Sequence, residues 1–148
     1  MKLSLPKAAR FIEDYKSAHT GVGKLFDMVY REVADTGGVK NFFGRFMPVD
    51  ADKPYVGVDY KIQSTAADLL KMRMVDCWRL LQDKQSSLIM TVHEELIFDI
   101  HDSEEHLLNV LHETMEEPDL FEVPLTCSIK TGLSWGTAVD RPIFELSS

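Results

Sequence analysis

Three adjacent residues, His93, Glu94 and Glu95, offer the clearest chemistry in this sequence. They separate two short runs rich in Leu, Ile, Val and Phe, Ser87 to Val92 and Leu96 to Ile100. Two such runs with so short a connection predict a tight β-hairpin that carries the polar residues at its tip. Tight turns favour Asn-Gly or Asp-Gly, so two carboxylates beside an imidazole are a local conflict of the kind that is commonest at functional sites.

The pattern at this turn leaves two interpretations open. It is a solvated charged turn, or it is a divalent-metal site, because carboxylate oxygens at the end of rigid strands suit Mg²⁺. A zinc peptidase site does not fit. That motif needs a second His four residues after the first on a helix, and Ile97 occupies that position in a predicted strand.

The elements that must position this turn predict an α+β fold, with a small antiparallel sheet backed by helices. Helices are expected from Ser4 to about His19, from about Val22 to Asp35, from about Ile62 to Asp83, and from Asp102, with Glu105 completing a capping box, to a stop at Pro118. The first two should form a short antiparallel pair, with Ala8, Ile12 and Tyr15 on one stripe of the first.

The remaining segments are predicted as strands and connections. We expect an extended segment or short hairpin from Val39 to Met47, an exposed loop from Asp50 to Tyr60, and a last strand from Val123 to about Thr131.

Composition limits the classes of protein that this chain can be. Its 148 residues, 45% hydrophobic and 27% charged, predict one ordinary soluble domain spanning 1–148. No apolar run approaches the roughly 20 residues that span a bilayer, so we expect no membrane contact and a cytoplasmic location. Cys77 and Cys127 are too few and too far apart for a disulfide scaffold or a zinc site, and we interpret them as core thiols. A net charge of −8 argues against binding nucleic acid unaided, so any DNA contact must be local or shared with another chain.

Two blocks of sequence stand out when they are taken together. Lys61 to Lys71 reads Lys-Ile-Gln-Ser-Thr-Ala-Ala-Asp-Leu-Leu-Lys, and Val92 to Ile97 reads Val-His-Glu-Glu-Leu-Ile. They resemble two motifs of the family A DNA polymerases, the bacterial polymerase I type: Pro-Ile-Gln-Gly-Thr-Ala-Ala-Asp, which opens a long palm helix, and motif C, Val-His-Asp-Glu in a hairpin. Other blocks similar to this family, in the same order, are Phe11 to Tyr15, Phe42 to Arg45 with Pro48, and Val123 to Leu125 leading to Gly132 to Trp135.

This resemblance implies the C-terminal palm part of a DNA polymerase. Residues 1–38 would be a helical pair that follows the fingers, 39–60 an extended segment and loop, and 61–148 the palm helix, the motif C hairpin, a helix and a closing strand. Its implied activity is the addition of deoxynucleotides to a primer 3′ end in DNA replication, by two-metal catalysis with Mg²⁺. The implied partners are template-primer DNA, a dNTP and an N-terminal polymerase fragment.

The resemblance also implies roles for single residues. Glu94 stands where motif C has its metal-binding Asp, and Glu95 matches the acidic neighbour of the metal site. His93 matches a residue against the primer end, and Gln63 one that reads the minor-groove edge of the primer terminus. Arg45 is expected to meet a phosphate.

Two departures from the family divide the functional hypotheses. Glu94 is one methylene longer than Asp, and nothing in the chain resembles motif A or the fingers helix that meets the nucleotide. One hypothesis is therefore a split or partial polymerase, of phage or plasmid type and acting in the host cytoplasm if phage-encoded, which an N-terminal fragment completes. The alternative is a non-catalytic remnant or accessory binding domain that keeps the palm fold.

Overall fold

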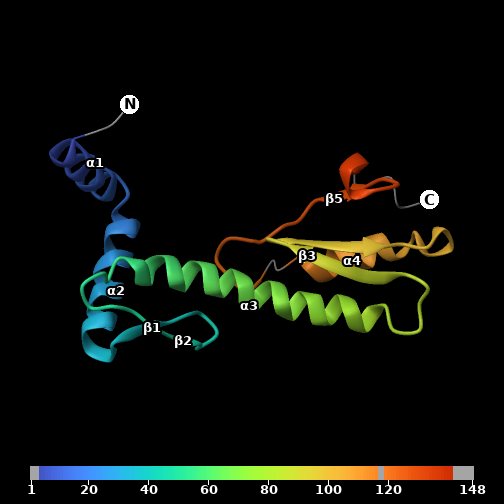
Figure 1. Ribbon diagram of the computed structural model, residues 1–148, viewed down its shortest axis with the longest axis horizontal. Coiled ribbons are helices and arrows are strands. Elements are labelled where there is room, and N and C mark those ends of the chain that lie inside the picture. Colours follow the sequence, from blue (N-terminus) through green and yellow to red (C-terminus); the bar gives the residue numbers. More distant parts are fainter. Residues whose placement is uncertain (1–3, 117–118, 142–148) are drawn as a thin grey trace. The chain divides into compact units, whose positions relative to one another are not determined.

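The computed structural model describes residues 4–116 and 119–141, and the chain divides into two compact units, Met1–Ala66 and Ala67–Ser148 (Figure 1). The first unit contains α1 (Leu5–Ala18), α2 (Thr20–Thr36), β1 (Gly38–Lys40), β2 (Phe46–Pro48) and the beginning of α3 (Val56–Leu80). The second contains the rest of α3, β3 (Ser87–Val92), β4 (Glu95–Asp99), a 3₁₀ turn (Asp102–Glu104), α4 (Leu107–Met115), β5 (Ile129–Thr131), a second 3₁₀ turn (Trp135–Thr137) and β6 (Val139–Arg141). No helix in the described ranges combines the length and hydropathy needed to cross a membrane.

Helices α1 and α2 are separated by a single residue, His19. Pro6 is accommodated in the first turn of α1, where its missing N–H costs no helical hydrogen bond. The expected antiparallel pair is wrong, because a helical hairpin needs a loop of about 2–5 residues to reverse the chain. The two helices instead meet at a bend (Figure 1), where the Lys16 ammonium lies 4.5 Å from the centre of the Phe26 ring. No α1 residue is buried, and Ile12 and Tyr15 of its expected apolar stripe are about half exposed.

The core of the first unit joins α2 to the β1–β2 hairpin and the beginning of α3. Its buried members are Val29, Val33, Val39, Val49 and Val58. Gly37 ends α2 in the left-handed conformation, with φ of 75°, which glycine adopts at low cost. β1 and β2 pair antiparallel, which confirms the short hairpin predicted for this stretch.

Helix α3 begins earlier than the sequence predicted. It starts at Val56, whereas Asp50 to Tyr60 was expected to be an exposed loop. The local composition favoured a loop, but Gly57 and Val58 are buried in the core of the first unit, and tertiary packing outweighs weak helix propensity. The helix also ends at Leu80, three residues before the predicted Asp83, whose φ of 63° is not helical.

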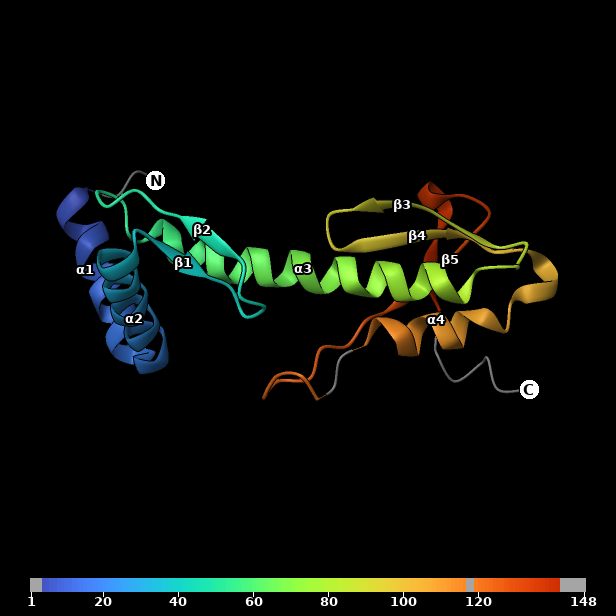
Figure 2. The same cartoon turned by 90° about the horizontal axis from the view of Figure 1, so that it is seen from below.

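In the second unit the β3–β4 hairpin lies on one side of α3 and α4 on another (Figure 2). The buried residues that join them are Cys77, Leu81, Leu107 and Leu111, with Leu88, Leu96, Phe98, Ile100 and Met115 packed against them. β5 and β6 form a further antiparallel pair. The prediction of an α+β fold with a hairpin backed by helices is confirmed, although the described strands form three separate two-stranded sheets.

Two details of the second unit differ from expectation. The capping box from Asp102 to Glu105 is absent, because Glu105 instead forms an ion pair with Arg141 at 2.6 Å and α4 begins only at Leu107. The last strand is also shorter than predicted. Within the described residues, the continuous strand is Ile129–Thr131, whereas the run from Val123 to Thr126 is exposed and has a single bridge residue, Leu125. The predicted stop at Pro118 lies outside the described residues.

Candidate functional site

The acidic turn is the tip of the β3–β4 hairpin. Val92 and Glu95 form the last strand pair, so His93 and Glu94 are the two turn residues. His93, Glu94 and Glu95 are all exposed. The structure thus brings these three predicted residues together at one accessible point of the second unit.

The backbone at this tip is strained at His93, whose φ is 52°. An L-residue in this left-handed region costs roughly 1–2 kcal/mol, although His is among the types found there more often than most. Glu94 has no positive φ. A positive φ at the first turn residue alone is the sign pattern of a type II′ turn, which favours glycine at that position. The chain therefore places an imidazole where glycine would be more stable.

Hydrogen bonds at the opposite end of the hairpin hold it to the following 3₁₀ turn. The Glu104 carboxylate accepts from the Ser86 hydroxyl at 2.6 Å and from the backbone N–H groups of Ser86 and Gln85 at 2.8 and 3.2 Å. The Ser86 hydroxyl oxygen in turn accepts from the backbone N–H of His101 at 3.0 Å. The hydrogen bond from Ser86 holds the pKa of Glu104 below its usual value. The sequence did not predict these hydrogen bonds of Ser86 and Glu104, which we call the Ser86–Glu104 clamp, because no motif links residues that are 18 positions apart.

Arg45 and Gln63 belong to the first unit. The Asn41 side chain, which is 5% exposed, accepts from the backbone N–H groups of Phe43 and Arg45 at 3.0 and 2.9 Å. The N–H of Phe42 donates to the Thr65 hydroxyl of α3 at 3.2 Å. Arg45 is exposed, and the buried side chain of Asn41 holds its backbone in place. Gln63 is exposed on α3.

An ion pair joins three elements of the first unit near these residues in the sequence. The Lys61 ammonium donates to the Glu32 carboxylate at 2.7 Å and to the Lys40 carbonyl at 2.5 Å, and the same carboxylate accepts from the N–H of Lys40 at 2.7 Å. Burial alone would raise the pKa of Glu32, but the hydrogen bonds and charges of the two lysines lower it. Lys61 occupies the position of Pro in the motif that this segment resembles. Its side chain links α3 to α2 through Glu32 and to β1 through Lys40.

The chemistry of the tip suits a hard cation only in part. Glu94 and Glu95 supply carboxylate oxygens, which Mg²⁺ prefers. Among the described residues, however, the one group of three side chains close enough to share a metal ion is His112, Glu116 and Cys127, which does not include the tip. The tip by itself therefore does not bring three such ligands together.

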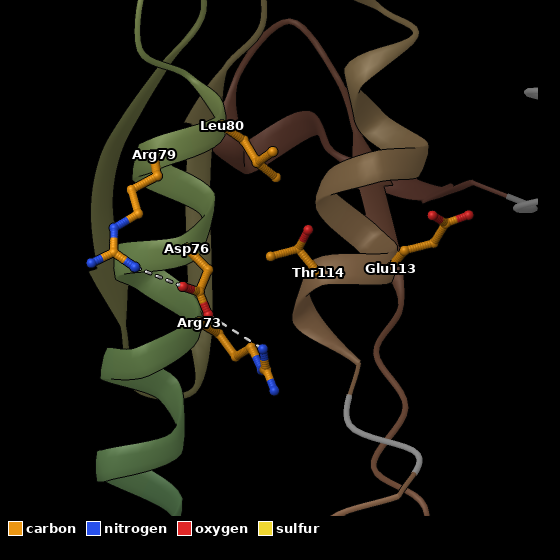
Figure 3. A pocket seen from close by; sticks show the side chains of 6 residues that line it. All are labelled: Arg73, Asp76, Arg79, Leu80, Glu113 and Thr114. Carbon is orange, nitrogen blue, oxygen red and sulfur yellow. Dashed lines mark hydrogen bonds and ion pairs between the residues drawn. The ribbon is translucent and has the colours of Figure 1, made fainter.

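The pocket lined by Arg73, Asp76, Arg79, Leu80, Glu113 and Thr114 contains none of the predicted site residues (Figure 3). It is an open space of about 440 Å³ between α3 and α4. Asp76 forms ion pairs with Arg73 and Arg79 at 3.3 and 3.4 Å. Asp76 and Glu113 together balance the charges of the two arginines that line the pocket, so it carries no net positive charge.

Comparison with known proteins gives a consistent relationship. The sequence model of DNA polymerase family A matches residues 1–137. The chain is 26% identical to the DNA polymerase I of Caldicellulosiruptor bescii in an alignment that covers 91% of this chain and 17% of that protein. It is 30% identical to the DNA polymerase I of Lactococcus lactis subsp. lactis in an alignment that covers 86% of this chain and 16% of that protein. The chain thus spans only a small part of the curated relatives it matches.

A solved structure shares the fold. The POL domain of Pol1 from M. smegmatis, in complex with DNA primer-template and dNTP, superposes with a TM-score of 0.74 at 23% sequence identity. The match covers 83% of this chain and 24% of that one.

Proposed function

This chain belongs to family A of the DNA polymerases, and we propose that it forms the C-terminal palm part of a DNA-directed DNA polymerase. Such an enzyme adds deoxynucleotides to a primer 3′ end during DNA replication, and we place it with that DNA in the cytoplasm. The chain covers 16–17% of the length of the two relatives named above, so the active enzyme requires additional polymerase sequence.

One observation carries this proposal: His93, Glu94 and Glu95 are exposed at the tip of a clamped hairpin, on a turn that would be more stable with glycine. A strained backbone with polar side chains is a feature that a purely structural turn has no reason to keep. In a chain that matches the polymerase family over residues 1–137, catalysis is the function that accounts for it.

Each predicted residue has a role within this proposal. Glu94 would hold Mg²⁺, and Glu95 would add negative charge beside it. When bound, the metal ions would supply Lewis-acid activation of the primer hydroxyl and stabilise the leaving pyrophosphate. His93 would lie against the primer end, where its fixed turn position limits the directions in which the imidazole can point.

The two residues of the first unit would contact DNA. Gln63 would donate to the minor-groove acceptors that all base pairs share, which permits checking without sequence preference. Arg45 would pair with a phosphate, and the Asn41 hydrogen bonds fix the backbone that carries it. A net charge of −8 means that most phosphate neutralisation must come from the N-terminal polymerase fragment.

The exposed face of α1 is consistent with such a fragment. Leu5, Phe11, Ile12 and Tyr15 are 87, 67, 51 and 49% exposed. Apolar side chains gathered along one helix mark an interaction surface in a stable protein. We infer that the N-terminal polymerase fragment covers them.

The second candidate function is a non-catalytic remnant that uses the palm fold as a binding surface. Glu94 favours it, because a side chain one methylene longer than Asp displaces the carboxylate from the position that catalysis requires. Primer extension decides between the two.

The test mixes the chain with the upstream part of a polymerase from the same genome, on template-primer DNA with Mg²⁺ or Mn²⁺. We expect extension only in the mixture, lost in Glu94→Ala and retained in Glu122→Ala, which removes an exposed carboxylate outside the tip. If neither the wild-type mixture nor Glu94→Asp extends the primer, while DNA binding persists, the chain is a binding remnant and the catalytic proposal is wrong.

A further inference from the structure

A second cluster of metal-ligating side chains lies at the C-terminal end of α4, outside the predicted polymerase site. His112, Glu116 and Cys127 each offer one ligand atom, and the three atoms all lie within 4.8 Å of one another. Glu116 is the C-cap residue of α4, four residues after His112, and its carboxylate lies 3.5 Å from the His112 imidazole. Cys127 comes from the segment that leads into β5. We propose that these three residues form a zinc-binding site.

The geometry of the cluster is close to that of a bound ion. The imidazole of His112 is 6% exposed, and its Nε2 lies 3.5 Å from the Glu116 carboxylate and 3.0 Å from the Cys127 carbonyl oxygen. The Cys127 thiol lies 3.7 Å from the His112 carbonyl oxygen. Zinc bonds of about 2.0–2.3 Å in a tetrahedral site separate the ligand atoms by roughly 3.3–3.8 Å. Because the ligand atoms all lie within 4.8 Å of one another, the cluster needs to contract by at most about 1.5 Å.

The donor types select the metal. One nitrogen, one carboxylate oxygen and one sulfur suit zinc, whereas Mg²⁺ takes oxygen ligands alone. The end of α4 also favours a cation, because the unpaired carbonyls of a helix C-terminus carry partial negative charge. Glu116 is 30% exposed, so water can reach the fourth position.

Binding exchanges the present hydrogen bonds for metal bonds. Without metal, Nε2–H of His112 donates to the Cys127 carbonyl and the Cys127 thiol donates to the His112 carbonyl. Zinc binding breaks the S–H bond and releases its proton to solvent, while the neutral imidazole carries its remaining proton on Nδ1. The metal then ties the Cys127 segment to the end of α4.

Titration of the full chain with Co²⁺, a coloured substitute for zinc, tests the proposal. We expect one equivalent to bind with a thiolate charge-transfer absorption, and Zn²⁺ to displace it. Cys127→Ser should abolish that absorption and weaken zinc binding by about 100-fold or more, because loss of a ligand exceeds the roughly 10–100-fold effect of outer partners. Glu116→Gln should weaken zinc binding at least about 10-fold.

Cys77→Ala is the matched control, since Cys77 is the other thiol of the chain. It should keep the Co²⁺–thiolate absorption. The proposal is overturned if the folded wild-type chain shows no such absorption, if the absorption survives Cys127→Ser, or if Cys77→Ala removes it. Should Cys127→Ser fail to fold, the partly exposed Glu116→Gln still decides the outcome, because unchanged zinc affinity in that variant contradicts the site.

Discussion

Replacement of His93 by glycine should make the second unit more stable, although it removes a proposed primer contact. The φ of 52° at His93 costs an L-residue roughly 1–2 kcal/mol, and glycine avoids that cost. Glycine also gives up more conformational entropy on folding, which offsets about 0.5–1 kcal/mol of the gain. We therefore expect His93→Gly to raise the free energy of unfolding by about 0.5–1 kcal/mol. For a chain of this length that is a rise in Tm of about 1–4 °C.

The neighbouring turn residue provides the control for this prediction. Glu94 has no positive φ, so Glu94→Gly pays the same entropy without any relief and should lower stability by about 0.5–1 kcal/mol. Urea unfolding followed by tryptophan fluorescence measures both variants, because Trp78 and Trp135 lie in the same unit as the hairpin. Equal losses of stability in the two variants would refute the argument from turn strain. A stabilised His93→Gly that extends primers more slowly in the mixture would indicate that the strain is retained for function.

Three other predictions concern the supports of the fold. Gly57→Ala should destabilise the chain by about 1–3 kcal/mol, because the added Cβ would lie 2.9 Å from two valine methyls. Gly21→Ala is the control, because a Cβ there meets open space and should not destabilise the chain. The urea concentrations at the midpoints of unfolding compare the two variants. Lys61→Met should cost about 1 kcal/mol at neutral pH. The pKa of Glu32 is lowered in the folded chain, so its contribution to stability is present above the usual value of 4.5 and is lost as the pH falls through the lower folded value. The difference in free energy of unfolding between wild type and Lys61→Met should therefore disappear at that low pH. A difference that does not change with pH would contradict this. Burial raises the pKa of both thiols, that of Cys77 to about 11, but Cys77 is fully buried and Cys127 only partly, so thiol labelling followed by mass spectrometry should modify Cys127 first and Cys77 only on unfolding.

The sequence predicted the β3–β4 hairpin because its signal is local. Two apolar runs with a connection predicted at three residues leave few alternatives, and their pairing from Ser87 with Asp99 to Val92 with Glu95 needs no distant partner. The observed turn is one residue shorter, because Glu95 joins β4. The conflict at the tip was also visible in the residue types. The positive φ of His93 was not, because the sequence does not tell which of two turn residues takes the left-handed conformation.

The errors arose where tertiary contacts decide the local structure. Gly57 reads as a loop residue, yet it is buried in α3 because only a residue without Cβ allows Val29 and Val39 to approach so closely. Glu105 reads as a capping residue, yet it pairs with Arg141, 36 residues later. The bend at His19 follows from the length of the connection, which the predicted helix boundaries had overestimated by one residue.

Of two residues that differ from the family motifs, the structure explains one, Lys61, and not the other, Glu94. Lys61 in place of Pro is explained by its bonds to Glu32 and Lys40 within the first unit. Glu94 in place of Asp has no such explanation, since no hydrogen bond or ion pair joins its side chain to another residue of the described part of the chain. Glu94→Asp should therefore leave the free energy of unfolding within about 0.5 kcal/mol of wild type, as exposed substitutions do. Within the proposed function, any change in primer extension by that variant then reports the position of the carboxylate relative to the proposed metal and not the folding of the hairpin. A large loss of stability on urea unfolding would instead show that Glu94 supports the hairpin itself.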